Sequence, residues 1–445
     1  MIKKTDIMKK LLFILSALFI ASVALAQTSR EEIDAHPHIA MATHSVYAGG
    51  YFFNPLAEAP KGYKPFYISH YGRHGSRYEA EVEQTGDLLG IFRTAEKLGL
   101  LTAKGKEVLA LAIWNDEHQK DMTGQLTPLG KEQHKAIARR MYARFKPVFQ
   151  RGAIIDSRSS DYPRCILSMA AFNESLKESQ PLLETRMLTG ERYQNVIRPI
   201  RSKTTDYTHR ERKKVDHEWK KQLNAWAATK SFDHALGEMF TNVDLLCKEI
   251  NYTKHDLAVF VYKRVAFVQN FGKSDRTLID SIFSAEERHN IYLYENFRWY
   301  CQYTCSTLPD SKRYFAPMHY LVDDIINHAD LAIEGKNSAS ANLRFGHDYY
   351  LLGMLAVINC NEIRTDLDIS SVEKIGEMWK SYRCVSMASN LQFVFYNSKK
   401  CSDILVRILE NENDITLPLE SATAPFYKWE DVKKYLSERA DSFRK

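Results

Sequence analysis

Beyond its first thirty residues, the sequence has no apolar run long enough to cross a bilayer. It also has no internal repeat and no low-complexity segment. Hydrophobic residues make up 44% of the chain and aromatic residues 12%, which is typical of a packed globular protein. These features exclude a disordered chain, and we do not expect a membrane among the partners of the mature protein.

A strong excess of charge of one sign is also missing. The formal net charge is +6, and four lysines and one aspartate within residues 1–26 account for half of it. The rest of the chain is therefore only mildly basic, which is too little to indicate a nucleic-acid partner.

Cysteine is scarce and odd in number, with seven residues in all. An odd number leaves at least one thiol free, and a domain of this size does not need disulfides to fold. Cys301 and Cys305 are four residues apart on an expected helix, but no second Cys or His pair follows at zinc-site spacing. We therefore interpret most of the cysteines as buried small apolar residues and predict no metal and no cofactor.

The N-terminus has the pattern of a secretory signal peptide. Four lysines precede the apolar run 11–25, and Ala24-Leu25-Ala26 is a small-x-small cleavage site. No cysteine follows that site, so lipid attachment is not expected. The pattern predicts that residues 1–26 are removed and that the protein is periplasmic or secreted, the alternative being a retained anchor.

Three segments share one order of elements: a short apolar strand, a polar loop and a helix. The strands are expected at 66–69, 153–156 and 341–345, with helices from Pro163 and over 349–359 after the last two. In an open α/β sheet, ligands bind beyond the carboxyl ends of strands. The three loops, far apart in sequence, are therefore expected to meet at one site.

Between about 186 and 330 the character of the sequence changes: residues 198–221 are dense in charge, and long stretches have helical spacing, as over 319–333. Further strands are expected at 391–396 and 404–409. We predict an α/β fold with three αβα layers and a mostly parallel central sheet. Residues 27–185 and 331–445 form this domain, and residues 186–330 form an inserted, mostly helical domain.

The loop after the first strand carries the clearest chemistry. His74 lies between Arg73 and Arg77, whose charges disfavour the imidazolium and leave the ring neutral and nucleophilic. The same guanidinium groups can hold a tetrahedral oxyanion. Gly75 lets the backbone approach a ligand. The pattern indicates phosphoryl transfer through a phosphohistidine, and the alternative is a basic surface loop.

The other two loops add groups that such a reaction needs. Arg164 is expected in the first turn of its helix, where free amides also favour an anion. His347 opens the third helix and could bind the phosphoryl group, and Asp348 could protonate the leaving oxygen if burial or the bound phosphate raised its pKa. Taken alone, Arg164 could be a solvated helix residue and His347-Asp348 an ordinary helix start.

The motifs resemble those of the histidine acid phosphatases. Residues 73–78 are similar to the RHGxRxP motif, with Glu79 in place of the usual proline. The segments at 126–134, 164–172 and 343–348 resemble the family's LTxxGxxQ, third-arginine and second catalytic motifs. The resemblance implies that His74 is the nucleophile, that Asp348 is the acid, and that phosphate is bound by Arg73, Arg77, Arg164 and His347.

Within this family, the chain is most similar to the multiple inositol polyphosphate phosphatases, which act on phytate. This group usually has His-Ala-Glu, whereas here Asp348 directly follows His347 and Tyr349 stands in the glutamate's place, as in HD-type phytases and glucose-1-phosphatases. The resemblance implies a monomeric, metal-independent phosphomonoesterase for small inositol phosphates. The alternatives are a broader acid or sugar phosphatase, or a phosphate-ester binding protein that has lost turnover.

Two other clusters have alternative interpretations. His36, His38 and His44 could be a metal site, but they lie where the sequence indicates no clear helix or strand. The basic run 210–214 is typical of a solvated helix face, and it could also attract a polyanion.

Overall fold

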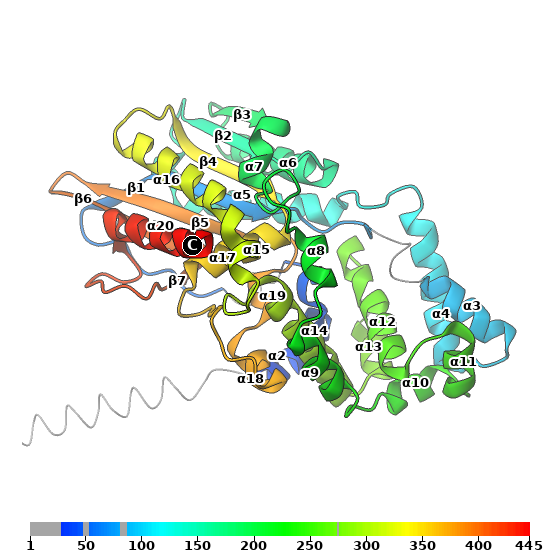
Figure 1. Cartoon of the computed structure of the whole chain (residues 1–445). Helices are drawn as coiled ribbons and strands as arrows, with labels where there is room; N and C mark the ends of the chain where they lie inside the picture. Colours follow the sequence, from blue (N-terminus) through cyan, green and yellow to red (C-terminus); the bar gives the residue numbers. More distant parts are fainter. Residues whose placement is uncertain (1–27, 48–52, 81–86, 274–275) are drawn as a thin grey trace, which may run out of the picture.

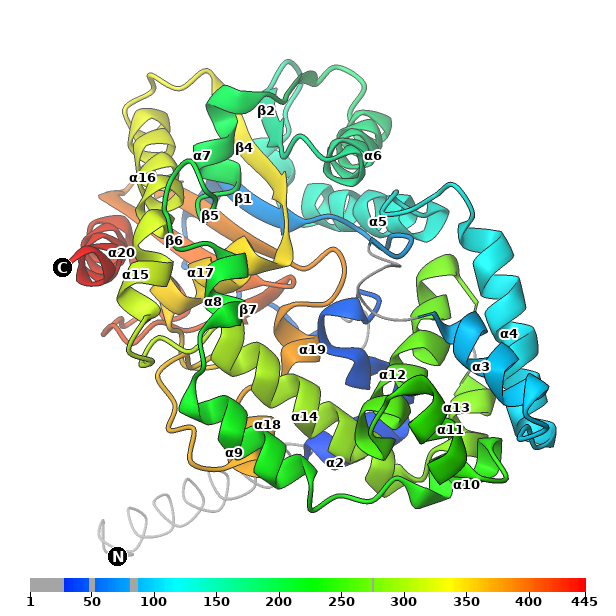
Figure 2. The same cartoon turned by 45° about the vertical axis from the view of Figure 1, so that its right-hand side comes forward.

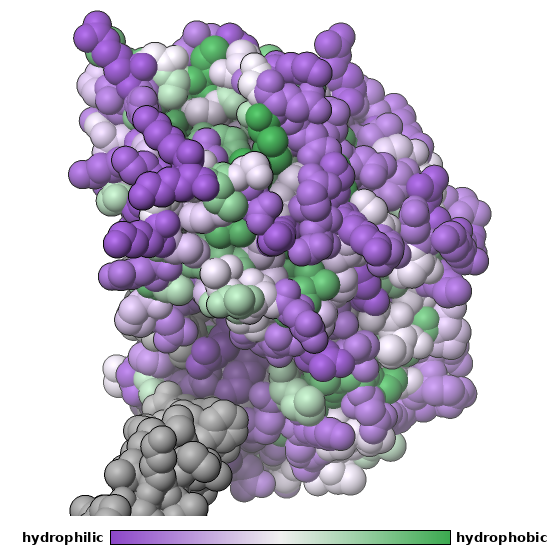
Figure 3. Space-filling model, turned by 90° about the vertical axis from the view of Figure 1, so that its left-hand side faces the viewer, coloured by the Kyte–Doolittle hydropathy of each residue, from purple (hydrophilic) through white to green (hydrophobic). Residues whose placement is uncertain are grey.

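The computed structural model describes residues 28–47, 53–80, 87–273 and 276–445 (Figure 1). The predicted signal peptide at residues 1–26 lies outside these ranges. Within them, no helix is both long and apolar enough to cross a membrane. Figure 3 shows a face covered mostly by hydrophilic side chains, with hydrophobic ones only in small groups.

An eight-stranded mixed sheet forms the centre of the molecule, in the order β3-β2-β4-β1-β5-β6-β7, with β8 paired to β6. Strands β3, β2, β4 and β1 are parallel neighbours, and β5 is antiparallel to both β1 and β6. Five strands, β1 to β4 and β6, therefore run in one direction, which confirms the predicted mostly parallel sheet. The strands are β1 Tyr63–Arg73, β2 Ile154–Ser159, β3 Glu184–Leu188, β4 Ala339–Gly346, β5 Asn390–Ser398, β6 Cys401–Glu410, β7 Asn413–Ile415 and β8 Tyr427–Lys428.

Helices cover both faces of the sheet (Figure 2). In β1, Ile68 packs into the apolar layer shared with α5 and α6, whereas Tyr67 and Tyr71 pack into the layer on the opposite face. This alternation is the period-2 pattern of a strand buried on both sides. The three-layer prediction is confirmed. The covering helices are α5 Pro128–Arg144 and α6 Pro163–Ser179 on one face, and α16 His319–Ile333, α17 Asp348–Ile358 and α20 Trp429–Arg444 on the other.

Local sequence explains where the helices next to the site begin. Thr127 caps α5 by accepting from Gly130 N, and Pro128 takes the first helical position. Pro163 likewise takes the first helical position of α6. Helix α17 is apolar all round and almost wholly buried because it lies between the sheet and the helical part of the molecule.

The helical part lies beside the α/β layers and draws on several regions of the chain (Figure 2). Helix α14 contacts the 3-10 helix η1, and α10 contacts α4. Helix α16, most of which falls within the range 186–330, packs against β1 and β4. The division at 186 and 330 stays a prediction. The elements are η1 Pro37–His44, α4 Ala103–Gln119, α8 His209–Lys214, α9 Glu218–Ala227, α10 Asp233–Met239, α12 Lys254–Phe267 and α14 Ala285–Tyr303.

All seven cysteines are free, and all except Cys401 are buried. This agrees with their interpretation as small apolar residues. Helix α14 ends at Tyr303 and Thr304 is its C-cap, so Cys305 lies beyond the helix. The expectation that Cys301 and Cys305 share one helix is therefore wrong.

Candidate active site

The three predicted loops meet at the carboxyl ends of β1, β2 and β4, which are neighbouring parallel strands. The loops after β1 and β2 each donate a backbone hydrogen bond to the end of β4. His74 N donates to Gly346 O at 3.0 Å, and Ser160 N donates to Phe345 O at 2.9 Å. The geometry brings the rings of His74 and His347 to a centroid separation of 5.6 Å.

The loop of residues 73–77 is held by backbone packing and by two side chains. Gly75 lies so close to Gly130 that a Cβ on Gly75 would be 2.4 Å from Gly130 O. Gln133 accepts from Ser76 N at 2.8 Å and donates to Ser76 Oγ at 2.9 Å. Ser168 of α6 accepts from Gly75 N at 3.1 Å. The segment that resembles LTxxGxxQ therefore shapes the loop that carries His74.

The orientation of the His74 ring decides which nitrogen can react. Its Nδ1 lies 2.9 Å from Gly75 O. Because a carbonyl only accepts, Nδ1 carries the proton and Nε2 keeps its lone pair. Burial, followed by the charges of Arg164 and Arg73, holds the pKa of His74 well below its usual value. The side chain is therefore a neutral imidazole with its free lone pair on Nε2.

Three arginines surround this histidine, but they are not equally available to a ligand. Arg73 is fully buried and donates to the carbonyls of Thr43 and Val385. Arg77 donates to Tyr78 O at 2.9 Å, and burial together with Arg164 lowers its pKa to about 10. The positive charges of these guanidinium groups outnumber the negatively charged groups nearby, so the site favours an anionic ligand.

Arg164 is the second residue of α6, as predicted, and its guanidinium lies over the Tyr162 ring at 4.7 Å. It donates to Gly124 O at 3.4 Å, and its charge acts on both His74 and His347. Arg164 is therefore not simply a solvated helix residue, because its guanidinium packs on the Tyr162 ring and donates to the backbone at Gly124.

Asp348 opens α17 and is bound to the first loop. Its Oδ2 pairs with the Arg73 guanidinium at 2.9 Å and accepts from Thr43 Oγ1 at 2.8 Å. Burial would raise the pKa of Asp348, but Arg73 and the Thr43 hydroxyl outweigh it and hold the pKa below its usual value. Burial therefore does not keep this carboxyl protonated in the free protein, and the predicted role of Asp348 as an acid depends on a bound phosphate raising its pKa.

The histidine cluster at 36–44 and the basic run 210–214 differ in the structure from what the sequence indicated. Residues 37–44 form helix η1, so His38 and His44 lie in a defined element, yet the described residues contain no group of three or more His, Cys, Asp or Glu placed to hold a metal. In the basic run 210–214, Arg212 is fully buried against Tyr314 and pairs with Asp310 at 3.3 Å. That part of the run is structural and not solvated.

The family model of the histidine phosphatase superfamily (branch 2) matches residues 72–411, which is more than half of the chain. The chain belongs to this superfamily. Human (Homo sapiens) multiple inositol polyphosphate phosphatase 1 is 23% identical to it over an alignment of 398 residues, which covers 82% of this chain and 77% of the human protein. The predicted resemblance is confirmed, and the chain is a histidine acid phosphatase, a phosphomonoesterase.

Solved structures support the same fold. The multiple inositol polyphosphate phosphatase of Bifidobacterium longum, in complex with phosphate, has a TM-score of 0.71 at 16% identity, covering 89% of this chain and 97% of that one. The phytase from D. castellii has a TM-score of 0.64 at 13% identity, covering 90% and 85%.

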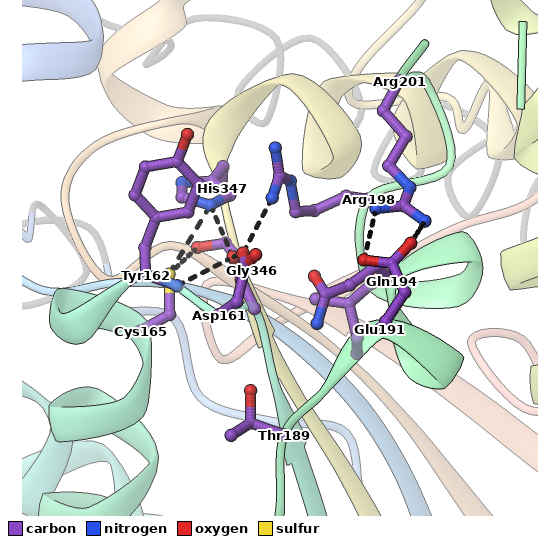
Figure 4. A network of polar contacts seen from close by, with 12 residues as sticks. Asp161, Tyr162, Cys165, Thr189, Glu191, Gln194, Arg198, Arg201, Gly346 and His347 are labelled. Atoms are coloured by element: carbon purple, nitrogen blue, oxygen red, sulfur yellow. Dashed lines mark hydrogen bonds and ion pairs between the residues drawn. The ribbon is translucent and has the colours of Figure 1, made fainter. Parts of the chain in front are cut away.

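Sequence reasoning missed several polar groups around the site of this histidine phosphatase. Thr43 contacts Asp348, Ser160 lies beside His347, and Tyr162 packs edge-on against the His347 ring at 5.1 Å. Arg198 pairs with Asp161 at 2.7 Å and lies over Tyr162 at 4.9 Å (Figure 4). Ser160 and Tyr162 fall between two predicted elements, whereas Thr43 had no signal in the sequence.

Proposed function

We propose that this enzyme hydrolyses phytate and lower inositol polyphosphates through a phosphohistidine on His74. The observation that carries the proposal is the bond from His74 Nδ1 to Gly75 O, which leaves Nε2 unprotonated among Arg77, Arg164 and His347. A neutral imidazole held in one orientation, surrounded by cations, fits nucleophilic attack on a phosphate monoester.

In the proposed reaction, a bond forms between Nε2 and phosphorus while the bond from phosphorus to the ester oxygen breaks. Asp348 gives its proton to the leaving alkoxide, and the arginines and His347 bind the phosphoryl oxygens. Water then attacks phosphorus, its proton returns to Asp348, and the bond to Nε2 breaks. The products are the alcohol and inorganic phosphate.

The proposal includes independence from metals and cofactors. Arg73, Arg77 and Arg164 supply the positive charge that a divalent cation supplies in metal-dependent phosphatases. Guanidinium groups stay charged over the working range of an acid phosphatase. The enzyme is further proposed to be exported, on the basis of its N-terminal sequence. It is also proposed to act as a monomer.

The substrate proposal is supported by the likeness to multiple inositol polyphosphate phosphatases in sequence and fold. One observation favours a second candidate, a sugar phosphatase: Tyr349 follows Asp348 and packs against His209 at 4.2 Å and Tyr303 at 4.8 Å. An aromatic side chain beside the acid is suited to the less charged face of a sugar ring.

The decisive test is His74→Ala with trapping of the intermediate. Wild-type enzyme mixed with ³²P-labelled substrate and quenched rapidly should carry acid-labile label, and His74→Ala should carry none and lose several orders of magnitude of kcat. His234→Ala, on the exposed side of α10, is the matched control and should keep both label and activity. Normal turnover by His74→Ala would rule out the mechanism.

The substrate is tested with a panel of phytate, glucose 1-phosphate and p-nitrophenyl phosphate. We expect the highest kcat/KM for phytate. A higher value for glucose 1-phosphate would establish the sugar-phosphatase alternative, and no turnover of any of the three would indicate a binding protein.

A further inference from the structure

His347 is held from one side by a hydroxyl that no family motif identifies. Ser160 Oγ lies 3.0 Å from His347 Nε2. Ser160 is fully buried, and its backbone is fixed because Ser160 N donates to Phe345 O at 2.9 Å. The contact therefore joins the end of β2 to the start of α17, next to the proposed phosphate site.

The neighbouring groups decide which partner holds the shared proton. Cys165 Sγ also lies 3.7 Å from His347 Nε2, but its hydrogen is directed at Gly346 O, 3.3 Å away (Figure 4). Burial raises the pKa of Cys165 to about 12, so it stays a thiol. Cys165 therefore does not compete with Ser160 for the lone pair of Nε2.

A second acceptor for the Ser160 hydroxyl lies farther away and is shared with an arginine. Asp161 Oδ1 lies 3.3 Å from Ser160 Oγ, but the same oxygen binds Arg198 at 2.7 Å. Of these two contacts of Ser160 Oγ, the one to His347 Nε2 is the shorter, at 3.0 Å. The shorter contact favours donation from the Ser160 hydroxyl to Nε2, which places the proton of a neutral His347 ring on Nδ1.

We propose that Ser160 is a positioning residue that keeps His347 in the Nδ1–H tautomer, so that the ring offers an N–H and not a lone pair to a phosphoryl oxygen. The inference rests on the proposed role of His347 as a phosphate ligand. A neutral imidazole has a single N–H, and a lone pair directed at a phosphate dianion is repelled.

The same hydroxyl can also serve the charged ring. When a phosphate dianion favours protonation of His347, Nε2 gains a proton and becomes a donor. Ser160 Oγ then accepts from Nε2 and turns its own hydrogen to Asp161 Oδ1, which is within reach at 3.3 Å. No proton is lost or gained by Ser160 in this exchange.

The first experiment measures the tautomer in the free enzyme, without turnover. Long-range ¹H–¹⁵N correlation of ¹⁵N-histidine-labelled protein should show His347, assigned by loss of its signals in His347→Asn, as the Nδ1–H form. Ser160→Ala should shift it towards the Nε2–H form, and Ser160→Thr should restore the wild-type pattern. An Nε2–H tautomer in the wild type would overturn the proposal whether or not the Ser160 variants fold.

The second experiment links the tautomer to ligand binding. Ser160→Ala should weaken inhibition by inorganic phosphate about tenfold, a change of about 1.4 kcal/mol, and Ser160→Thr should recover most of it. Ser159→Ala is the matched control: Ser159 is equally buried, and its hydroxyl has no hydrogen-bond partner among the described residues. An unchanged inhibition constant in Ser160→Ala, with an unchanged tautomer, would also overturn the proposal.

These readouts separate the two proposals. An enzyme without phosphatase activity that still shows the Nδ1–H tautomer would contradict the proposed function and leave the role of Ser160 intact. An active enzyme with the Nε2–H tautomer would contradict only the role of Ser160.

Discussion

Arg73 and Asp348 form an ion pair of 2.9 Å in which the side chains are only 1% and 12% exposed. The pair connects the end of β1 to the start of α17, and it keeps the carboxyl ionised in the free enzyme. A phosphate dianion bound by Arg73, Arg77 and Arg164 competes with Asp348 for the positive charge of Arg73. Substrate binding is therefore expected to raise the pKa of Asp348, so that the acid is formed in the complex.

Asp348→Asn tests this role through the leaving group. Phytate and sugar phosphates leave as basic alkoxides that need a proton, whereas p-nitrophenolate leaves readily without one. The variant should hydrolyse phytate about 10²–10⁴-fold more slowly, the usual worth of a positioned acid, and should lose much less on p-nitrophenyl phosphate. Steady-state kcat values for both substrates give the comparison.

Thr43→Val is the matched control because it keeps the carboxyl and removes only one hydrogen bond to it. The kcat of this variant should fall only slightly, and to a similar extent on phytate and on p-nitrophenyl phosphate. Equal large losses in Asp348→Asn would assign Asp348 to phosphate binding or folding, and no loss would give the role of acid to another residue.

Metal independence is tested by dialysis against EDTA. Because guanidinium groups supply the charge in the proposed site, turnover should stay within about twofold, which is about 0.4 kcal/mol of barrier. Activity that is lost on dialysis and restored by zinc or magnesium would contradict the proposal.

Several features of the fold follow from local sequence. The strands and helices around the three loops were predictable because most of them have a continuous apolar period, and because Pro163 marks the start of α6. The convergence of the loops was predictable because parallel strands place their carboxyl ends at one edge of a sheet. The helix predicted over 319–333 coincides with α16.

The interactions inside the site could not be predicted in the same way. Thr43 lies some three hundred residues from Asp348 in sequence, and no periodicity links the two. The direction of the pKa shift of Asp348 depends on whether burial or Arg73 dominates, and this is decided by a distance. The buried state of Arg212 likewise depends on Tyr314, which is contributed by another helix.

Stability should fall in mild acid because of His70 and His134. Burial lowers the pKa of each to about 3, whereas both rings take up protons near pH 6.5 in the unfolded chain. Between pH 6.5 and about pH 3 the unfolded state therefore binds more protons, and the free energy of unfolding decreases as the pH falls. Each histidine contributes a slope of about 1.4 kcal/mol per pH unit.

Urea unfolding between pH 7.5 and pH 5 measures this slope. His134→Leu should lower the slope by the share of one histidine, because the replacement cannot take up a proton when the chain unfolds. A slope that is the same in the variant and in the wild type would show that His134 is already protonated in the folded enzyme.

The contact between Gly75 and Gly130 gives the last prediction. A Cβ on Gly75 would lie 2.4 Å from Gly130 O, and a Cβ on Gly130 would lie 2.2 Å from Ser76 O. Each contact is with backbone, which cannot move aside as a flexible side chain does. Gly75→Ala and Gly130→Ala should therefore each cost about 1–3 kcal/mol of stability and displace the loop that carries His74.

Because catalysis depends on the position of Nε2, we expect a loss of about 10²-fold in kcat on p-nitrophenyl phosphate even in protein that is fully folded. Gly237→Ala is the control. Gly237 lies within α10 with nothing within 4 Å of a built Cβ, so alanine should stabilise that helix by about 0.5–1 kcal/mol and leave kcat unchanged. Thermal unfolding and kcat are measured for all three variants. Wild-type kcat in Gly75→Ala would mean that the loop can withdraw from the start of α5 without moving His74, and that the close approach is not required for catalysis.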